Sequence, residues 1–205
     1  MYVVLMAMLA LNISTEVLNG FSIVEESLNR TTSNSSKENE SIYSDFLEQM
    51  KTNPEKVKAW FDKATMVKQM SDSLYNYAQS LKEQIVKEAD GDDADLNNIV
   101  GKDNLEAAAH VMLAPGTGQG KKLYDAINSY RERILKMVND DHQRQLIAEN
   151  LSTKLPKKGN ALGKNWQEYM FESMPVAAAV TLLAKLQSDI RYAEGERHSE
   201  EYQAR

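Results

Sequence analysis

The spacing of apolar residues changes close to the N-terminus of the chain. Residues 1–11 (MYVVLMAMLAL) carry no charge, and the Tyr2 hydroxyl is their one polar side-chain group. Beyond Asn12 the apolar residues recur every three or four positions, at Ile13, Val17, Leu18, Phe21, Val24 and Leu28. Acidic and polar residues fill the positions between them, which is typical of an amphipathic helix. We therefore predict one continuous helix, from Ala7 through Leu28, that leaves an apolar medium and enters water.

The apolar run itself is shorter than a transmembrane span. A helix of eleven to thirteen residues is about 20 Å long, whereas the hydrocarbon core of a bilayer is about 30 Å thick. No basic residue precedes the run, and Met8 and Ala10 form a poor signal-peptidase site. A buried core helix is one interpretation. We favour another, in which residues 1–13 form the outer half of a transmembrane helix whose inner half and basic cytoplasmic flank lie upstream.

The amphipathic pattern thins over the polar tract 31–36 (TTSNSS) and then resumes. A loop between two helices would explain this tract, and so would one long helix with a polar stretch. Neither glycine nor proline interrupts residues 21–51, so we favour one helix. Asn53-Pro54-Glu55 then indicates a new helix, because it offers an N-cap, a proline for the first turn and an acidic residue beside it.

The segment after this restart has the most regular pattern in the chain. Two series of residues seven positions apart occupy the a and d positions of a heptad repeat: Val57, Ala64, Ser71, Ala78 and Ile85, and Trp60, Val67, Leu74 and Leu81. Small residues in the first series allow a neighbouring helix to approach closely. The pattern therefore predicts a helix that packs along a bundle seam.

Clusters of aspartate, glycine and proline divide the rest of the chain into shorter helices. The expected helices cover residues 105–113, 123–138 and 141–151. A further helical region starts at Asn165, and Pro175 either kinks it or separates two pieces. Residues 175–186 are almost entirely apolar, so we expect them at the centre of a bundle. The polar residues 196–205 indicate an exit linker.

These elements predict an all-α protein in which a long N-terminal helix, the outer part of a transmembrane span, runs into an antiparallel helical bundle. The expected organisation is a membrane segment (1–13), a bundle domain (14–195) and a linker (196–205). The net charge of −6 and the pI near 5.2 argue against nucleic-acid binding. The absence of cysteine excludes disulfides and thiolate chemistry.

Three features invite a chemical interpretation, and none completes a site. Residues 116–122 (GTGQGKK) resemble a phosphate-binding loop, but Pro115 replaces its first glycine and Lys122 its Ser or Thr. The acidic residues 90–95 do not supply the ligands of a calcium loop in any one register. The three histidines lie far apart in the sequence. We therefore predict no catalytic, cofactor-binding or metal-binding residue, and no enzymatic activity.

Four segments spread over the chain carry a further signal. They are MYVVLMAMLALNISTEVLNGF at the start, DSLYNYAQSLK (72–82), VMLAPGTGQGKKL (111–123) and NWQEYMFESMPVAAAVTLLAKLQSDIRYAEGE (165–196). Together they resemble the GldM/PorM family, inner-membrane proteins of the type IX secretion and gliding-motility machinery of Bacteroidota. The resemblance implies a single-pass helix in the bacterial inner membrane and a helical domain in the periplasm. It also implies a homodimer inside a ring of a multi-span GldL/PorL-like protein, which together form a proton-driven motor.

On this resemblance we expect a non-enzymatic subunit that transmits conformational change from the membrane ring to further periplasmic secretion components. A surface of Tyr2, Met6, Ala7, Leu9 and Ala10 is the expected contact with the ring and the dimer mate, because small residues let helices pack closely in lipid. Simple lipid contact is the alternative for this surface.

Two further expectations concern function. Prolines placed at Val17 or Phe21 should abolish secretion, because they would interrupt the helix that leaves the membrane. The alternative function is a periplasmic module that binds a peptide or a lipid in a groove beside residues 175–186.

Overall fold

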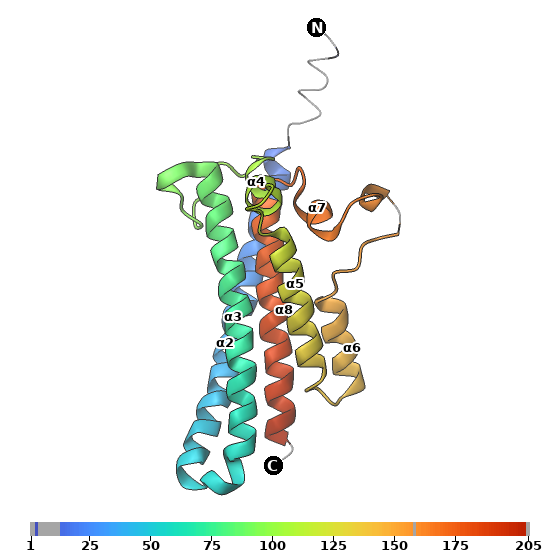
Figure 1. The fold of residues 1–205 in the computed structure, drawn as a ribbon. Coiled ribbons are helices and arrows are strands. Elements are labelled where there is room, and N and C mark those ends of the chain that lie inside the picture. The colour runs from blue at the N-terminus through green and yellow to red at the C-terminus, as the bar shows by residue number, and fades with distance from the viewer. Residues whose placement is uncertain (1–2, 4–12, 158, 204–205) are drawn as a thin grey trace.

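The computed structural model describes residue 3, residues 13–157 and residues 159–203 (Figure 1). The helices, in chain order, are α2 (Thr15–Thr52), α3 (Pro54–Asp90), α4 (Ala107–Leu113), α5 (Gly120–Leu135), α6 (Asp141–Asn150), α7 (Trp166–Phe171) and α8 (Val176–Gln203). Single turns of 3-10 helix cover Gly91–Asp93 and Gly159–Ala161. No strand occurs in these described ranges, and the prediction of an all-α helical bundle is confirmed.

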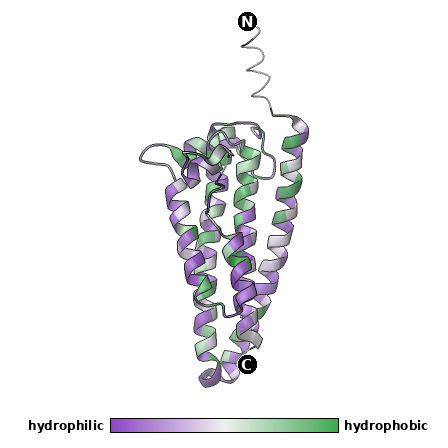
Figure 2. Cartoon of the chain, turned by 90° about the vertical axis from the view of Figure 1, so that its right-hand side faces the viewer, coloured by the Kyte–Doolittle hydropathy of each residue, from purple (hydrophilic) through white to green (hydrophobic). Residues whose placement is uncertain are grey.

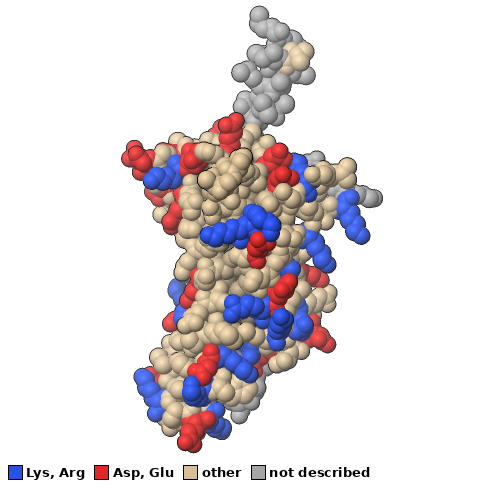
Figure 3. Space-filling model, viewed as in Figure 1, with Lys and Arg blue, Asp and Glu red and all other residues tan. Residues whose placement is uncertain are grey.

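Three long helices form the body of the bundle. α2 and α8 run in the same direction, α3 runs antiparallel to both, and the turn between α2 and α3 projects beyond the end of α8 (Figure 1). α5 packs against α3 and α8, with α6 and α7 beside it. The start of α2 and the end of α8 therefore lie at opposite ends of the bundle (Figure 2). Basic and acidic side chains are mixed over the face seen in Figure 3.

The first long helix begins at Thr15 because Ser14 caps it. Ser14 has an extended backbone (φ −65°, ψ 147°), and its Oγ accepts a hydrogen bond from the Val17 N–H at 3.3 Å. This bond satisfies one of the free amides of the first turn. Ile13 and Ser14 are not helical, so the predicted continuous helix is wrong at these two residues. The helical spacing of apolar residues continues from Ile13 to Val17 across Ser14. The spacing therefore does not indicate that a helix begins after Ser14.

The polar tract 31–36 belongs to α2, which confirms one long helix across it. Just beyond the tract, at Asn39, α2 and α8 approach each other closely. Asn39 Nδ2 donates a hydrogen bond to the Arg191 carbonyl oxygen at 3.0 Å, and a Cβ added to Gly195 would lie 2.8 Å from Asn39 Oδ1. Within the tract, Thr32 is buried, so the tract forms part of a packed helix and not a loop.

The heptad pattern of α3 is confirmed by burial. Pro54 occupies the first turn of α3, as predicted, although the Asn53 side chain makes no capping hydrogen bond. Every residue of the first heptad series is buried, and the second series is buried except for the half-buried Trp60. These residues face α8 and α2, so α3 contributes one complete side of the core.

The last helix provides the centre of the bundle. Pro175 separates α7 from α8, which is one of the two outcomes predicted for it. Ala179, Leu183 and Ile190 of α8 are at most 1% exposed. The prediction that the apolar residues 175–186 are central is confirmed.

Helix α8 extends through residues that were predicted to form an exit linker. It continues to Gln203, and Arg197 and His198 are 5% and 0% exposed. The linker prediction is therefore wrong for residues 196–203. Its polar composition was misleading because two of its polar side chains, Arg197 and His198, are buried in the bundle.

Phe46 should be the largest single contributor to stability at the turn end of the bundle. It is fully buried in a small cluster with Val57 and Ala64, which is separate from the main core. Phe46→Ala is expected to lower the free energy of unfolding by about 3–5 kcal/mol, because it leaves a cavity. Urea unfolding checks this, with the exposed neighbour Leu47→Ala as the control. Equal losses for the two variants would contradict the packing described.

Candidate functional site

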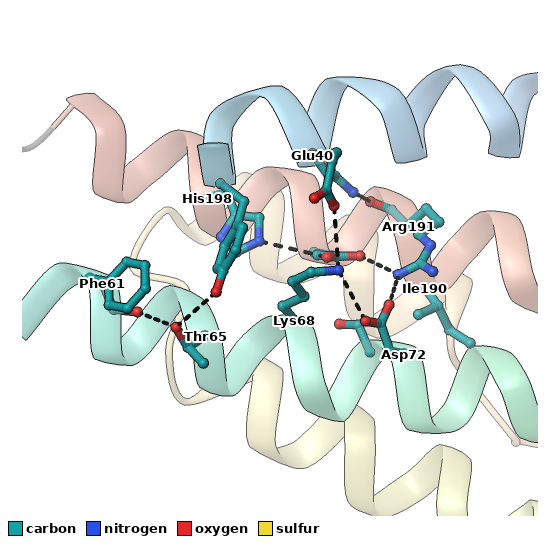
Figure 4. A network of polar contacts seen from close by, with 12 residues as sticks. Glu40, Phe61, Thr65, Lys68, Asp72, Ile190, Arg191 and His198 are labelled. Carbon is teal, nitrogen blue, oxygen red and sulfur yellow. Dashed lines mark hydrogen bonds and ion pairs between the residues drawn. The ribbon is translucent and has the colours of Figure 1, made fainter. Parts of the chain in front are cut away.

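Five charged side chains join the three long helices (Figure 4). This cluster, called the Arg191 network below, consists of Glu40 on α2, Lys68 and Asp72 on α3, and Arg191 and Glu194 on α8. Arg191 Nη1 donates hydrogen bonds to Asp72 Oδ1 at 2.8 Å and to Glu194 Oε2 at 2.7 Å. Lys68 Nζ lies 3.1 Å from Asp72 Oδ2 and 3.4 Å from Glu40 Oε2. The network thus ties α2 to α3 and α3 to α8.

The Arg191 network is partly removed from water, so its charges need partners of opposite sign to be stable. The side chains of Arg191 and Glu194 are 12% and 4% exposed, and the Arg191 guanidinium lies 4.2 Å from the centre of the Tyr75 ring. Burial alone would raise the pKa of Asp72, but hydrogen bonds from Arg191 and Lys68 outweigh it and lower this pKa. Burial alone would also lower the pKa of Arg191, and the two carboxylates raise it instead. Each charge therefore depends on its partners.

Two hydroxyl side chains and a histidine extend the polar contacts next to the Arg191 network. Ser71 Oγ lies 2.8 Å from the Tyr130 hydroxyl, which in turn donates to the Ile190 carbonyl oxygen at 3.3 Å. Burial raises the pKa of Tyr130 well above its usual range. His198 is fully buried, with Nε2 3.7 Å from Glu194 Oε1. These contacts fix the register of three helices and provide no nucleophile with an adjacent base.

Sequence reasoning missed this network, although a signal for it existed. Gln187, Arg191, Glu194 and His198 follow one another on α8 at intervals of four, three and four residues. This is the spacing of one helix face, and Gln187, Glu194 and His198 are at most 3% exposed. Polar residues with heptad spacing, directly after the apolar part of the same helix, therefore indicate a polar face that packs inside the bundle.

An apolar cavity of 280 Å³ lies beside the first half of α8. Its walls come from α5, α7, α8 and the segment after α6, and include Leu123, Ile127, Trp166, Met170, Leu183 and Leu186. Lys185 and Asp189 stand at its polar side, where Lys185 Nζ donates to Asp189 Oδ2 at 2.6 Å. The cavity is thus located where a groove for a peptide or lipid was expected.

The residues predicted to contact a membrane partner are not among those that the structure describes. Tyr2, Met6, Ala7, Leu9 and Ala10 lie outside the described ranges, and their role stays a prediction. Among the described residues, no helix combines the length and the apolar character needed to cross a bilayer.

The glycine-rich residues 116–122 form a tight connection from α4 into α5. A Cβ added to Gly118 would lie 2.7 Å from the Met112 carbonyl oxygen, and one added to Gly120 would lie 2.6 Å from Gln167 Cβ. These glycines therefore allow close backbone packing. Within the described ranges, no three His, Cys, Asp or Glu residues converge in a metal-binding arrangement.

A comparison with protein families assigns the bundle. A family model of the GldM N-terminal domain matches residues 16–200. The chain belongs to the GldM family. This confirms the resemblance drawn from the four sequence segments. GldM proteins are membrane-associated, structural components of the gliding-motility and type IX secretion machinery. No curated protein matches the chain closely enough to count as a relative.

The Arg191 network makes the stability of this GldM domain depend on pH at the acid end. The pKa of Asp72 is lower in the folded domain than in the unfolded chain. Its contribution is therefore fully present above about pH 4 and is lost as pH falls through the lowered pKa. Asp72→Asn should destabilise the domain at pH 7, and the difference from wild type should shrink towards pH 2.

Urea unfolding of both proteins between about pH 7 and pH 2 measures this difference. Asp62→Asn is the matched control, because Asp62 also pairs with a lysine on α3 but its side chain is 57% exposed. We expect little effect from it at any pH. A constant difference between wild type and Asp72→Asn across this range would contradict the pairing described.

Proposed function

We propose that the chain is a non-enzymatic, membrane-anchored subunit of the proton-driven motor that energises type IX secretion and gliding motility. It passes conformational change from an inner-membrane partner ring to the periplasm. The observation that carries this proposal is the match of residues 16–200 to the GldM N-terminal domain. Membership of the GldM family indicates the machinery in which the chain works. The arrangement of the helices supports the mechanical role.

In this proposal residues 1–13 are the membrane end of the subunit. The surface of Tyr2, Met6, Ala7, Leu9 and Ala10 contacts the multi-span GldL/PorL-like ring and the second copy of a homodimer. Small residues favour such contacts in lipid, where no hydrophobic effect drives helices together. The bundle that follows lies in the periplasm and contacts further secretion components.

Helix α2 is the element that receives motion from the membrane. Its 38 residues correspond to about 57 Å of helix, and it starts directly after the Ser14 cap. Thr181 Oγ1 on α8 donates a hydrogen bond to the Phe21 carbonyl oxygen at 3.2 Å near its start. Asn39 and Glu40 hold it to α8 and α3 further along. A displacement of α2 therefore moves all three long helices as one body.

The non-helical Ser14 gives this arrangement a defined joint. A continuous helix would transmit both bending and torsion stiffly, whereas an extended residue permits α2 to rotate relative to the segment that precedes it. The proposal is therefore that the membrane segment pulls and turns the bundle through Ser14, and that the cap fixes where the rigid part begins.

Complementation tests the motor role. A strain that lacks its own gene receives the whole natural protein, either unchanged or with both Ala7→Leu and Ala10→Leu. We expect the double variant to abolish secretion of type IX substrates and colony spreading, because leucine keeps the helix apolar but prevents close packing. Met8→Leu is the matched control and should complement fully. Normal secretion by the double variant would contradict the proposed contact surface.

A second function is favoured by one observation, the apolar cavity beside α8. Its volume and its leucine and aromatic lining suit an acyl chain or an apolar peptide side chain. In this alternative the chain is a periplasmic binding module. Such a module would retain its ligand without residues 1–13, whereas the motor role requires them. Native mass spectrometry of the chain purified with and without these residues distinguishes the two.

A further inference from the structure

A polar groove of 780 Å³ lies between α2, α3 and the connector that follows α3. α2 contributes hydroxyl, amide and carboxylate groups, among them Ser22, Glu26, Asn29 and Ser36. The volume is within the range of sites that hold small ligands. The groove is separate from the Arg191 network and from the apolar cavity.

Lys82 of α3 is the unusual residue of this groove. It is only 4% exposed and lines the groove, yet it makes no hydrogen bond or ion pair with any residue that the structure describes. Burial lowers the pKa of Lys82, and the more distant charges of Glu25 and Glu83 offset this only in part. Buried lysines are rare unless they are paired. Among the described residues, this ammonium group therefore has no direct partner, and it is available to a ligand in the groove.

The wall opposite α2 is held in place by hydrogen bonds. Asp90 Oδ2 accepts the Val100 N–H at 2.8 Å, and Asp90 Oδ1 accepts the Gly101 N–H at 2.7 Å. The Lys102 carbonyl oxygen accepts the Ala177 N–H of α8 at 3.1 Å. A Cβ added to Gly101 would lie 2.8 Å from Asp90 Oδ1, so this close approach needs glycine. The connector therefore keeps its place beside Lys82 when no ligand is present.

The acidic residues of the groove, Glu25 and Glu26, do not form an ion pair with Lys82. Glu25 accepts a hydrogen bond from Asn29 Nδ2 on its own helix. Glu26 is exposed at the rim and forms no ion pair among the described residues. The groove thus combines a largely buried lysine, which has no direct partner among the described residues, with surrounding hydroxyl and amide groups. This is the lining expected for an anionic ligand that also carries hydrogen-bonding groups.

We propose that this groove binds a carboxylate-bearing polar ligand, whose carboxylate accepts hydrogen bonds from Lys82 Nζ. The hydroxyl and amide side chains of α2 and the connector bind the ligand's remaining polar groups. A free peptide C-terminus and a sugar acid both offer this chemistry. Binding here would also bridge α2 and α3 close to the start of α2, where the subunit is proposed to receive motion.

Calorimetric titration of the full chain in detergent tests the site with four probes. N-acetyl-glycylglycine and D-glucuronate carry a carboxylate, whereas N-acetyl-glycylglycinamide and D-glucose are their uncharged counterparts. We expect at least one carboxylate probe to bind about tenfold or more tightly than its counterpart. Which of the two binds identifies the source of the carboxylate.

Two variants assign the binding to Lys82. Lys82→Met keeps the length of the side chain without its charge and should remove the preference for the carboxylate. Lys87→Met is the matched control, since Lys87 is an exposed lysine on the same helix, and it should bind as the wild type does. Equal binding by wild type and Lys82→Met would overturn the proposal, as would the absence of binding by either carboxylate probe.

A second measurement does not depend on the folding of a variant. The pKa of Lys82 in the wild-type chain, followed by NMR at its Cε, should rise when the carboxylate probe is bound. The uncharged counterpart should leave it unchanged. An unaltered pKa at saturation with the carboxylate probe would overturn the assignment to Lys82.

Discussion

Arg191→Met is expected to lower the free energy of unfolding of the bundle by about 3–5 kcal/mol. Arg191 is the shared partner of Asp72 and Glu194, and both its own side chain and that of Glu194 are almost fully buried. Without the guanidinium, these two carboxylates remain close together with one fewer compensating charge. Chemical denaturation at neutral pH measures the loss.

The matched control and a rescue variant separate loss of charge pairing from loss of packing. Lys58→Met removes a lysine whose side chain is 67% exposed and should change stability by less than about 1 kcal/mol. The triple variant with Asp72→Asn, Arg191→Met and Glu194→Gln should recover much of the stability, because no buried charge is left without a partner. A triple variant as unstable as Arg191→Met alone would contradict the electrostatic explanation.

Phe21→Pro is expected to abolish type IX secretion and gliding while most of the bundle stays folded. Phe21 lies beyond the first turn of α2, so proline there removes a main-chain hydrogen bond and clashes with the preceding turn, which is worth about 3 kcal/mol or more. It also disturbs the Phe21 carbonyl oxygen that accepts the Thr181 hydroxyl. The start of α2, which receives motion through the Ser14 joint, would then no longer be rigidly connected to the rest of the bundle. Secretion, colony spreading and the circular dichroism of the purified variant together check this.

Val17→Pro is the informative comparison, and the structure changes the expectation for it. Val17 lies in the first turn of α2, where its N–H bonds to Ser14 Oγ and not to a helical carbonyl. Proline here removes only the cap bond, at about 1 kcal/mol, and is tolerated in a first turn. We therefore expect Val17→Pro to secrete nearly normally. Equal loss of secretion in both variants would favour the original prediction of a continuous helix through Ser14. Normal secretion in both variants would contradict the proposal that α2 transmits motion from the membrane.

Most helices could be predicted from the sequence because their signals are local. The Asn53-Pro54 restart, the heptads of α3 and the break at Pro175 each depend on neighbouring residues and are found in the structure. The start of α2 could not be predicted in this way. Ser14 is one of many serines in the chain, and only the geometry of its Oγ and the Val17 N–H shows that α2 begins directly after it.

The polar contacts between helices were much harder to predict. Asp72 and Arg191 are 119 positions apart, and nothing in either local sequence indicates that the two side chains meet. Lys82 likewise follows the pattern of an ordinary lysine, and its burial depends on a connector that folds back through Asp90. Residues 196–205 are predicted to form a linker because a polar composition indicates solvent exposure on average. The burial of Arg197 and His198 depends on packing against other helices, which composition alone does not show.

Co-purification from membranes tests whether the apolar N-terminal run binds the inner-membrane ring. The whole natural protein is expressed beside its multi-span inner-membrane neighbour, and in a parallel sample everything before Ser14 is deleted. We predict that the partner is recovered with the first sample and is absent from the second. This result would place the contact on the apolar run and support the role of membrane-anchored motor subunit. Equal recovery with both samples would place the contact on the bundle, and no recovery with either would contradict the motor role.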